Sequence, residues 1–311
     1  MSVAFVFPGQ GSQSVGMLAE LADAFPSVGQ TFAEASEALG YNLWQLVLDG
    51  PAEELNKTHI TQPAMLSAGI AVWRIMQQQG RATPAVVAGH SLGEYTALVA
   101  AGAITFADAV KLVAERGRLM QEAVPAGQGA MAAILGLDDA VVIGICDAAA
   151  QGDVVSAVNF NSPGQVVIAG SAGAVERAIE GAKAAGAKRA LPLPVSVPSH
   201  CALMKPAAEK LAEQLAAITI SAPTIPVINN ADVAMVSDAD AIRDALVRQL
   251  YSPVRWVESV QKMAQDGVDT LVECGPGKVL VGLNKRIEKS MNAVAVFDAA
   301  SLEAALGALP A

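Results

Sequence analysis

The sequence predicts an α/β fold built on a parallel β-sheet, and three observations support that prediction. Hydrophobic residues make up 53% of the 311 residues and charged ones only 16%, so the chain can bury a large core. Aromatic residues make up only 4%, which favours helices packed on a β-branched sheet over an aromatic-rich sandwich. The short apolar runs show no alternation and are separated by helical patterns, as in a parallel sheet covered on both faces.

Three apolar segments are expected to form strands of this sheet, because each ends in a glycine-containing turn that a helical pattern follows. The expected strands are residues 3–7, 85–89 and 270–274. The main helices expected between them span residues 63–79, 93–101 and 105–123.

Residues 127–198 do not follow this alternation of apolar strands and helices, and their pattern predicts a second, smaller domain. The expected elements are a strand at 131–137, a helix at 138–150, strands at 154–159 and 165–169, a helix at 172–185 and a strand at 188–195. This β-α-β-β-α-β order is that of a ferredoxin-like unit. We therefore expect residues 127–198 to form a small ferredoxin-like domain, inserted into a large α/β domain of residues 1–126 and 199–311.

Charge and cysteine content narrow the possible partners. The net charge of −10 argues against nucleic acid as a partner, because phosphate binding needs a basic face. No apolar run approaches the roughly 20 residues of a membrane span, and the first segment lacks the basic start of a secretion signal. We therefore expect a cytoplasmic protein with no membrane contact. Cys146, Cys201 and Cys274 show no C-x-x-C spacing, so buried thiols are expected rather than a zinc site or disulfides.

A candidate nucleophile follows the second expected strand. Gly89-His90-Ser91-Leu92-Gly93 matches the G-x-S-x-G turn of α/β-hydrolases, a strained bend that exposes the serine oxygen at the carboxyl end of a sheet. Ser91 also precedes a helix, whose unpaired N–H groups and dipole can stabilise an oxyanion. We therefore expect the large domain to be α/β-hydrolase-like, with Ser91 as its nucleophile.

A serine nucleophile needs a base, and the chain has three histidines. His200 follows the last strand of the small domain, and loops at a domain junction commonly carry site residues. His90 adjoins Ser91 on the turn, so its side chain should point away and form a structural hydrogen bond. His59 lies in a polar stretch and is expected in a loop or helix cap. His200 is therefore the favoured base, with His59 as the alternative.

Four motifs of the chain occur together in one known family. They are Phe7-Pro8-Gly9-Gln10-Gly11-Ser12-Gln13, Gly89-His90-Ser91-Leu92-Gly93-Glu94-Tyr95, Ser199-His200 and Gly275-Pro276-Gly277-Lys278. In order and spacing the chain resembles the bacterial malonyl-CoA:acyl carrier protein transacylases, over nearly its whole length. The resemblance implies transfer of a malonyl group from malonyl-CoA to the phosphopantetheine thiol of acyl carrier protein, supplying fatty-acid synthesis. It implies no metal or cofactor, since malonyl-CoA is a substrate, and we expect a monomer.

The resemblance also implies roles for residues of the reacting centre. Ser91 would attack the malonyl thioester and carry the malonyl ester. His200 would take the serine proton and return it to the leaving thiol. The main-chain N–H groups of Gln10 and Leu92 would form the oxyanion hole. Gln249 would orient His200 through its main-chain carbonyl, in place of a triad carboxylate.

Arg116 can also be judged from the helix expected at residues 105–123. An apolar stripe runs along this helix, and Arg116 lies beside it, three residues after Val113. Such an arginine either extends its stem over the core or pairs its guanidinium with a carboxylate in a dry pocket. The second arrangement would select a dicarboxylic acyl group over acetyl. The resemblance implies that Arg116 binds the free carboxylate of malonyl, and that Gln62 lines the pocket.

Acyl carrier proteins are acidic, and so is this chain, so a local basic patch is expected to bind the carrier. Candidates are Lys188 with Arg189 and, near the end of the chain, Lys285, Arg286 and Lys289. The alternative is that these are solvated surface charges.

Other functions stay open on the sequence alone. A thioesterase would share Ser91 and His200 but transfer the acyl group to water; the lack of an obvious triad carboxylate argues mildly against it. The transferase component of a malonate decarboxylase would use a carrier with a different prosthetic arm. A binding module would not need Ser91 for activity. Residues 5–14 nearly match a dinucleotide fingerprint, but Ser14 replaces its last glycine, and an oxyanion loop explains them better.

Overall fold

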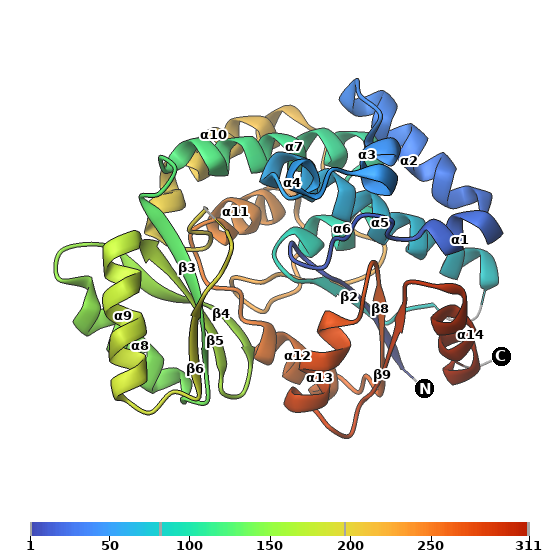
Figure 1. Cartoon of the computed structure of the whole chain (residues 1–311). Coiled ribbons are helices and arrows are strands. Elements are labelled where there is room, and N and C mark those ends of the chain that lie inside the picture. Colours follow the sequence, from blue (N-terminus) through green and yellow to red (C-terminus); the bar gives the residue numbers. More distant parts are fainter. Residues whose placement is uncertain (1, 81–82, 196, 310–311) are drawn as a thin grey trace.

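The computed structural model describes residues 2–80, 83–195 and 197–309 and contains two β-sheets (Figure 1). The five-stranded sheet has the order β7-β2-β1-β8-β9, and the four-stranded sheet has the order β4-β5-β3-β6. The strands are β1 (Val3–Phe7), β2 (Val86–Gly89), β3 (Gly129–Leu135), β4 (Val155–Ser162), β5 (Gln165–Ser171), β6 (Arg189–Pro192), β7 (Val227–Ile228), β8 (Thr270–Cys274) and β9 (Asn292–Val296).

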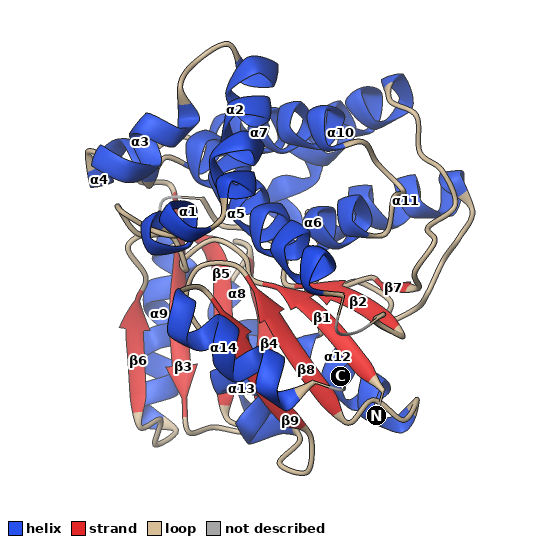
Figure 2. Cartoon of the chain, turned by 90° about the vertical axis from the view of Figure 1, so that its right-hand side faces the viewer, coloured by secondary structure: helices blue, strands red, loops and turns tan. Residues whose placement is uncertain are grey.

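Helices cover both sheets (Figure 2). They are α1 (Ala19–Ala24), α2 (Pro26–Leu39), α3 (Leu43–Asp49), α4 (Ala52–Leu55), α5 (Thr58–Gln79), α6 (Leu92–Ala100), α7 (Phe106–Ala123), α8 (Asp139–Ala150), α9 (Ala172–Ala184), α10 (Lys205–Ala217), α11 (Ala239–Gln249), α12 (Trp256–Gln265), α13 (Val279–Ile287) and α14 (Ala299–Ala308), with a 3₁₀ turn η1 at Ala202–Met204. Among the described residues, no helix is long and apolar enough to cross a membrane.

All strand pairs of the five-stranded sheet are parallel, which confirms the predicted α/β fold with a parallel sheet. Its central strand β1 is buried at every position, because successive side chains point into two different cores. Phe5 and Phe7 pack in a core with α2, α5 and α7, whereas Ala4 and Val6 pack in one with α12 and α13. This two-sided burial explains why the strand sequence shows no alternation.

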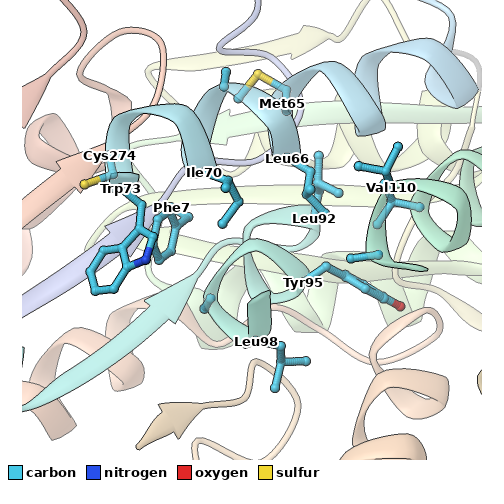
Figure 3. Packing of buried hydrophobic residues seen from close by; sticks show 14 of the residues in the cluster. Phe7, Met65, Leu66, Ile70, Trp73, Leu92, Tyr95, Leu98, Val110 and Cys274 are labelled. Atoms are coloured by element: carbon cyan, nitrogen blue, oxygen red, sulfur yellow. The ribbon is translucent and has the colours of Figure 1, made fainter. Parts of the chain in front are cut away.

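The first of these cores supports the turn that carries Ser91. Figure 3 shows Leu92 of α6 next to Leu66 of α5, and Ile70 of α5 and Tyr95 of α6 belong to the same core. All four side chains are buried, and the packing holds α6 against α5. The start of α6 is therefore fixed by close packing on a rigid helix.

The four-stranded sheet is antiparallel and presents its two faces to different surroundings. Ala132 and Ile134 of β3 face a core that α8 and α9 cover. On the other face, Met131 packs with Val167 and with Cys201, which lies beyond the sheet in the chain. Backbone hydrogen bonds between β4 and Val254 join this sheet to the rest of the molecule. The face that α8 and α9 do not cover shares a cavity with the loops that follow β1 and β2.

Several boundaries differ from the sequence prediction. Helix α5 begins at Thr58 rather than at Pro63, because a proline within a helix removes one hydrogen bond without ending it. Strand β6 ends at Pro192 instead of residue 195, since Pro192 and Pro194 lack the N–H groups that a ladder needs. Strands β7 and β9 were not predicted: β7 has two residues, and β9 is an edge strand whose side chains are mostly half-buried.

Candidate active site

Ser91 sits on a strained turn between β2 and α6. Its φ of 52° and ψ of −106° lie in a region that residues other than glycine rarely adopt. The two glycines of the motif explain how the turn is packed. A Cβ at Gly89 would lie 1.8 Å from the carbonyl carbon of Gly93, and one at Gly93 would lie 2.0 Å from the carbonyl oxygen of Phe7. Only glycine lets α6 approach β1 and β2 this closely.

Asn230, two residues beyond the end of β7, holds this turn. Its Oδ1 accepts a hydrogen bond from the Ser91 N–H at 2.7 Å, and its Nδ2 donates to the Gly89 carbonyl at 2.7 Å. Ser91 and Asn230 lie just beyond the carboxyl ends of the neighbouring parallel strands β2 and β7. Ligand sites of open α/β sheets commonly form at this edge.

His200 faces the serine. Its Nε2 lies 2.7 Å from the Ser91 Oγ, and its Nδ1 lies 2.8 Å from the main-chain oxygen of Gln249. Because a carbonyl oxygen can only accept, Nδ1 carries the proton and Nε2 is left to accept the proton of the serine hydroxyl. The main-chain N–H of His200 donates to the Leu250 oxygen at 2.9 Å, and its φ is 65°. The ring is therefore held in one orientation from both sides.

The electrostatics of His200 keep the ring neutral. The side chain is buried, and burial together with the nearby positive charge of Arg116 lowers its pKa to about 3. At neutral pH the imidazole is thus the base form that a serine nucleophile requires.

Arg116 projects from α7 into the same site and is 1% exposed. Its Nη1 donates to the Gln62 Oε1 at 2.8 Å, and its Nη2 donates to the Gln249 Oε1 at 3.0 Å and to the Ser91 Oγ at 3.3 Å. The guanidinium also lies over the Tyr95 ring, with its Cζ 5.3 Å from the centroid.

Arg116 has no carboxylate partner within 4.0 Å among the described residues. Buried charges are normally paired, and burial lowers the pKa of this guanidinium. Two neutral amides hold it in place 3.3 Å from the nucleophile. The site is therefore suited to an anionic ligand group beside the Ser91 Oγ.

A cavity of about 320 Å³ opens in front of Ser91, between the two sheets. Its polar lining includes Arg116, the amides of Gln10, Asn159, Asn161 and Gln165, and the hydroxyls of Ser12, Thr58, Ser91 and Ser199. Its apolar lining includes Met131, Val167, Leu193, Val279 and Leu283. The cavity is thus lined by both apolar side chains and residues that carry amide groups, which suits a ligand with apolar and amide groups of its own.

Gln10 and Leu92 also line this cavity. Leu92 is the first residue of α6, so its N–H has no acceptor within the helix. Gln10 follows Gly9, where a Cβ would lie 2.5 Å from the carbonyl oxygen of His90. The loop after β1 therefore lies directly against the serine turn, and both N–H groups belong to backbone beside the nucleophile.

The other two histidines lie outside the reacting pair. The His90 Nε2 is 2.8 Å from the Asn161 Oδ1 on β4, and its ring packs on Trp256, so it links the turn to the antiparallel sheet. His59 lies in the first turn of α5, with its Nδ1 2.8 Å from the Gln121 Oε1. In the part of the chain that the structure describes, no group of three or more His, Cys, Asp or Glu could hold a metal ion.

Sequence reasoning missed two buried residues of the site, Asn230 and Glu94. Asn230 stands in the polar stretch 229–232, which resembles an ordinary turn. Glu94 belongs to the serine motif, but a glutamate in the first turn of a helix is a common surface choice. Leu92 and Tyr95 of the same motif are hydrophobic, and this local sequence signal could have indicated that Glu94 is buried.

Comparisons with known proteins agree with this geometry. The model of the acyl transferase domain family matches residues 4–303. The malonyl CoA-acyl carrier protein transacylase of Salmonella typhimurium is 67% identical over 303 residues, covering 97% of this chain and 98% of that protein.

Two solved structures are also similar to this chain in three dimensions. The crystal structure of an acyl carrier protein S-malonyltransferase from Vibrio cholerae is 64% identical, with a TM-score of 0.96, covering 98% of this chain and 100% of that one. A malonyl-transacylase in complex with a type II PKS acyl-carrier protein is 61% identical, with a TM-score of 0.98, covering 99% and 100%. The resemblance predicted from the motifs is thus confirmed, and the chain belongs to the malonyl CoA-acyl carrier protein transacylase family of acyl transferases.

Proposed function

We propose that this acyltransferase moves a malonyl group from malonyl-CoA to the phosphopantetheine thiol of acyl carrier protein, by way of a malonyl ester on Ser91. The observation that carries the proposal is the buried Arg116, which has no carboxylate partner among the described residues and lies 3.3 Å from the Ser91 Oγ. A malonyl group bound to Ser91 would bring its free carboxylate to that guanidinium. The transfer would supply fatty-acid synthesis.

In the first half-reaction, the His200 Nε2 takes the proton of Ser91 as Oγ attacks the thioester carbonyl. The oxygen of the tetrahedral intermediate accepts hydrogen bonds from the N–H groups of Gln10 and Leu92. The C–S bond then breaks, and His200 returns the proton to the departing CoA thiol. The main-chain oxygen of Gln249 holds the Nδ1 proton throughout and stabilises the transient imidazolium.

The second half-reaction reverses these steps with a different thiol. His200 takes the proton of the carrier's phosphopantetheine thiol, and the sulfur attacks the malonyl-Ser91 ester. The C–O bond breaks, and the proton passes from His200 to the Ser91 Oγ, which restores the free enzyme. Neither half-reaction calls for a metal or a redox cofactor.

Arg116 also explains how the substrate activates the base. The positive charge of Arg116 contributes to the low pKa of His200. A malonyl carboxylate paired with the guanidinium cancels that charge and makes His200 more basic when it must accept the serine proton. Acetyl-CoA has no such carboxylate, so it loses both the ion pair and this activation. Gln62 holds one terminal nitrogen of the guanidinium, Nη1, while Gln249 holds the other, Nη2.

Intact-mass measurement after incubation with malonyl-CoA tests this function. The wild type should gain one malonyl group, and Ser91→Ala should gain none. Arg116→Ala should lose the preference for malonyl over acetyl. Arg118→Ala is the matched control, because Arg118 lies on the same helix but is exposed and paired with Glu115 and Glu122.

Each alternative has its own outcome in the same experiment. Rapid release of CoA and malonate without an adduct would identify a thioesterase. An adduct that only a carrier with another prosthetic arm can collect would indicate a malonate decarboxylase component. Unchanged activity in Ser91→Ala would indicate a binding module.

The carrier protein is expected to dock at the mouth of the cavity beside α13. Val279, at the start of this helix, lines the cavity and is 48% exposed, while Lys285 and Arg286 are exposed at its end. The Arg286 Nη1 donates to the Gln165 Oε1 at 2.8 Å, and Gln165 lines the cavity. The Arg286 contact and the exposed Val279 support docking at this basic cluster.

Charge reversal separates the two candidate patches. Lys285→Glu with Arg286→Glu should slow transfer to the carrier protein and leave acylation by malonyl-CoA intact. Lys188→Glu with Arg189→Glu is the matched control on the antiparallel sheet, where both side chains are exposed. Equal transfer rates in the first pair and the wild type would remove the α13 cluster from the proposal.

We also propose that residues 127–198 form a ferredoxin-like domain inserted into an α/β-hydrolase-like domain of residues 1–126 and 199–311. The chain order β3-α8-β4-β5-α9-β6 and the sheet order β4-β5-β3-β6 support this division. Cytoplasmic location and a monomeric state belong to the same proposal. Sedimentation of the purified protein tests the monomer, and fractionation of cells tests the location.

A further inference from the structure

Glu94 is a buried carboxylate beneath the active site that the reaction described above does not use. It lies in the first turn of α6 and is 2% exposed. Its Oε2 accepts two hydrogen bonds, from the side-chain Nε2 of Gln249 at 2.8 Å and from the main-chain N–H of Asn230 at 3.0 Å. No described lysine or arginine lies within 4.0 Å of it.

The Gln249 side chain connects Glu94 to Arg116. Its Nε2 donates to Glu94 and to the Ser91 carbonyl at 2.9 Å, and its Oε1 accepts from the Arg116 Nη2 at 3.0 Å. The Ser91 carbonyl and an ionised Glu94 can only accept, so they require the amide nitrogen to face them. The amide oxygen must then face the guanidinium. The reversed amide would set NH₂ against the Arg116 N–H groups and its oxygen against two acceptors, the Ser91 carbonyl and the Glu94 Oε2.

We propose that Glu94 is a positioning residue which, through the Gln249 amide, fixes Arg116 in the orientation that selects a carboxylate-bearing acyl group. This inference rests on the function proposed above. Glu94 stays one side chain away from Arg116 instead of pairing with it. A direct ion pair would occupy the guanidinium and compete with the substrate. The relay through Gln249 orients the arginine and leaves it without a competing carboxylate.

Two substitutions separate the hydrogen bond from the charge. Glu94→Gln removes the charge but can present a carbonyl oxygen to Gln249 and Asn230. Glu94→Asp keeps the charge but withdraws the oxygen by one methylene. The readout is the ratio of kcat/KM for malonyl-CoA to kcat/KM for acetyl-CoA, measured as acylation of Ser91. A merely structural role would lower both rates together and leave the ratio unchanged.

We expect Glu94→Gln to keep the wild-type ratio and Glu94→Asp to lower it roughly tenfold, as for the loss of one hydrogen bond to a charged group. Gln249→Leu should lower the ratio as well, and Glu94→Asp should add little to it in the double variant. A low ratio in Glu94→Gln with a normal ratio in Glu94→Asp would overturn the proposal, because charge alone would then matter. Additive effects in the double variant would also overturn it. If Glu94→Asp does not fold, Glu94→Met replaces it with the same expectation.

Glu273 supplies the matched control. It is a second buried glutamate in the same domain, but its carboxylate accepts from the N–H groups of Leu280 and Val281 at the start of α13. Glu273→Asp should lower thermal stability as Glu94→Asp does, without changing the ratio of kcat/KM values. If Glu273→Asp lowered that ratio as much as Glu94→Asp does, the effect on Arg116 would be non-specific and the proposal would be overturned. If the wild type forms no malonyl adduct, the proposed function itself fails. If the wild type prefers malonyl-CoA and Glu94→Asp keeps the same ratio, the role of Glu94 is refuted while the proposed function stands.

Discussion

Asn230→Ala tests whether the strained turn at Ser91 is held by the hydrogen bonds that surround it. The substitution removes the acceptor of the Ser91 N–H and the donor to the Gly89 carbonyl, both at 2.7 Å. Asn230 itself is buried, and each buried group left unpaired costs about 1–3 kcal/mol. The expected loss in the free energy of unfolding is therefore about 2–5 kcal/mol.

The same substitution should also slow acylation. A residue at the φ and ψ of Ser91 stores about 1–3 kcal/mol of strain, which is released once its surroundings no longer hold it. Relaxation of the turn would move the Oγ away from the His200 Nε2, now at 2.7 Å. A displacement of about 1 Å commonly costs around 10²-fold in rate. Urea unfolding measures the stability, and quenched-flow mass spectrometry measures the malonyl adduct.

Asn229→Ala is the matched control for this experiment. Asn229 is also buried, but its Oδ1 accepts from the Asp232 N–H at 2.8 Å and does not contact the turn. It should lose stability and keep the wild-type rate of acylation. The reasoning is refuted if Asn230→Ala loses the expected stability and still acylates at the wild-type rate. The remaining bond from the Gln249 Nε2 and the packing of α6 would then suffice to hold Ser91.

Three further predictions concern Gly93, Glu273 and His200. Gly93→Ala should unfold the protein or cost more than about 4 kcal/mol of stability, because its Cβ would meet rigid backbone. Gly144→Ala is the control: it lies inside α8, a Cβ there would meet nothing within 4 Å, and thermal unfolding should show a gain of about 0.5–1 kcal/mol. Burial raises the pKa of Glu273 to about 7 from 4.5, so its contribution to stability is complete below pH 4.5 and is lost as pH rises through 7. Glu273→Gln should flatten that fall in urea unfolding, by up to about 3 kcal/mol. The rate of acylation should not fall as pH is lowered through 6.5, since the pKa of His200 is about 3. The assay uses Glu94→Gln, because burial also raises the pKa of Glu94 to about 7 and its titration would otherwise overlap this range.

The sequence was sufficient to predict the elements that carry a local signal. The strand that ends at Phe7 and the one that leads to Ser91 are short apolar runs that end at glycines, and both were placed to within a residue. The chain order of the antiparallel unit was also predicted, because its two sheet faces impose a clear pattern. Strand β7 could not be predicted, since its two residues pair only because β2 lies beside them.

The residues of the site also divide into those that a local motif predicts and those whose contacts depend on the fold. Ser91 and His200 come from motifs, and the structure brings them together across a separation of 109 positions. The contacts of Arg116 with Gln62 and Gln249 depend on where α5, α7 and α11 cross, which no local pattern encodes. The resemblance to a family placed these residues in one site before any contact was known.

Asn230 and Glu94 show why a buried polar network is difficult to predict from sequence. Each is satisfied entirely by groups far away in the chain, such as the Asn230 N–H that donates to Glu94 across 136 positions. In isolation, an asparagine in a turn and a glutamate at a helix start both favour water. Their burial costs free energy unless every partner is in place, so the network forms only in the complete fold. The polar atoms that orient Ser91 and Arg116 therefore assemble only when the chain has already brought β2, β7 and α11 together.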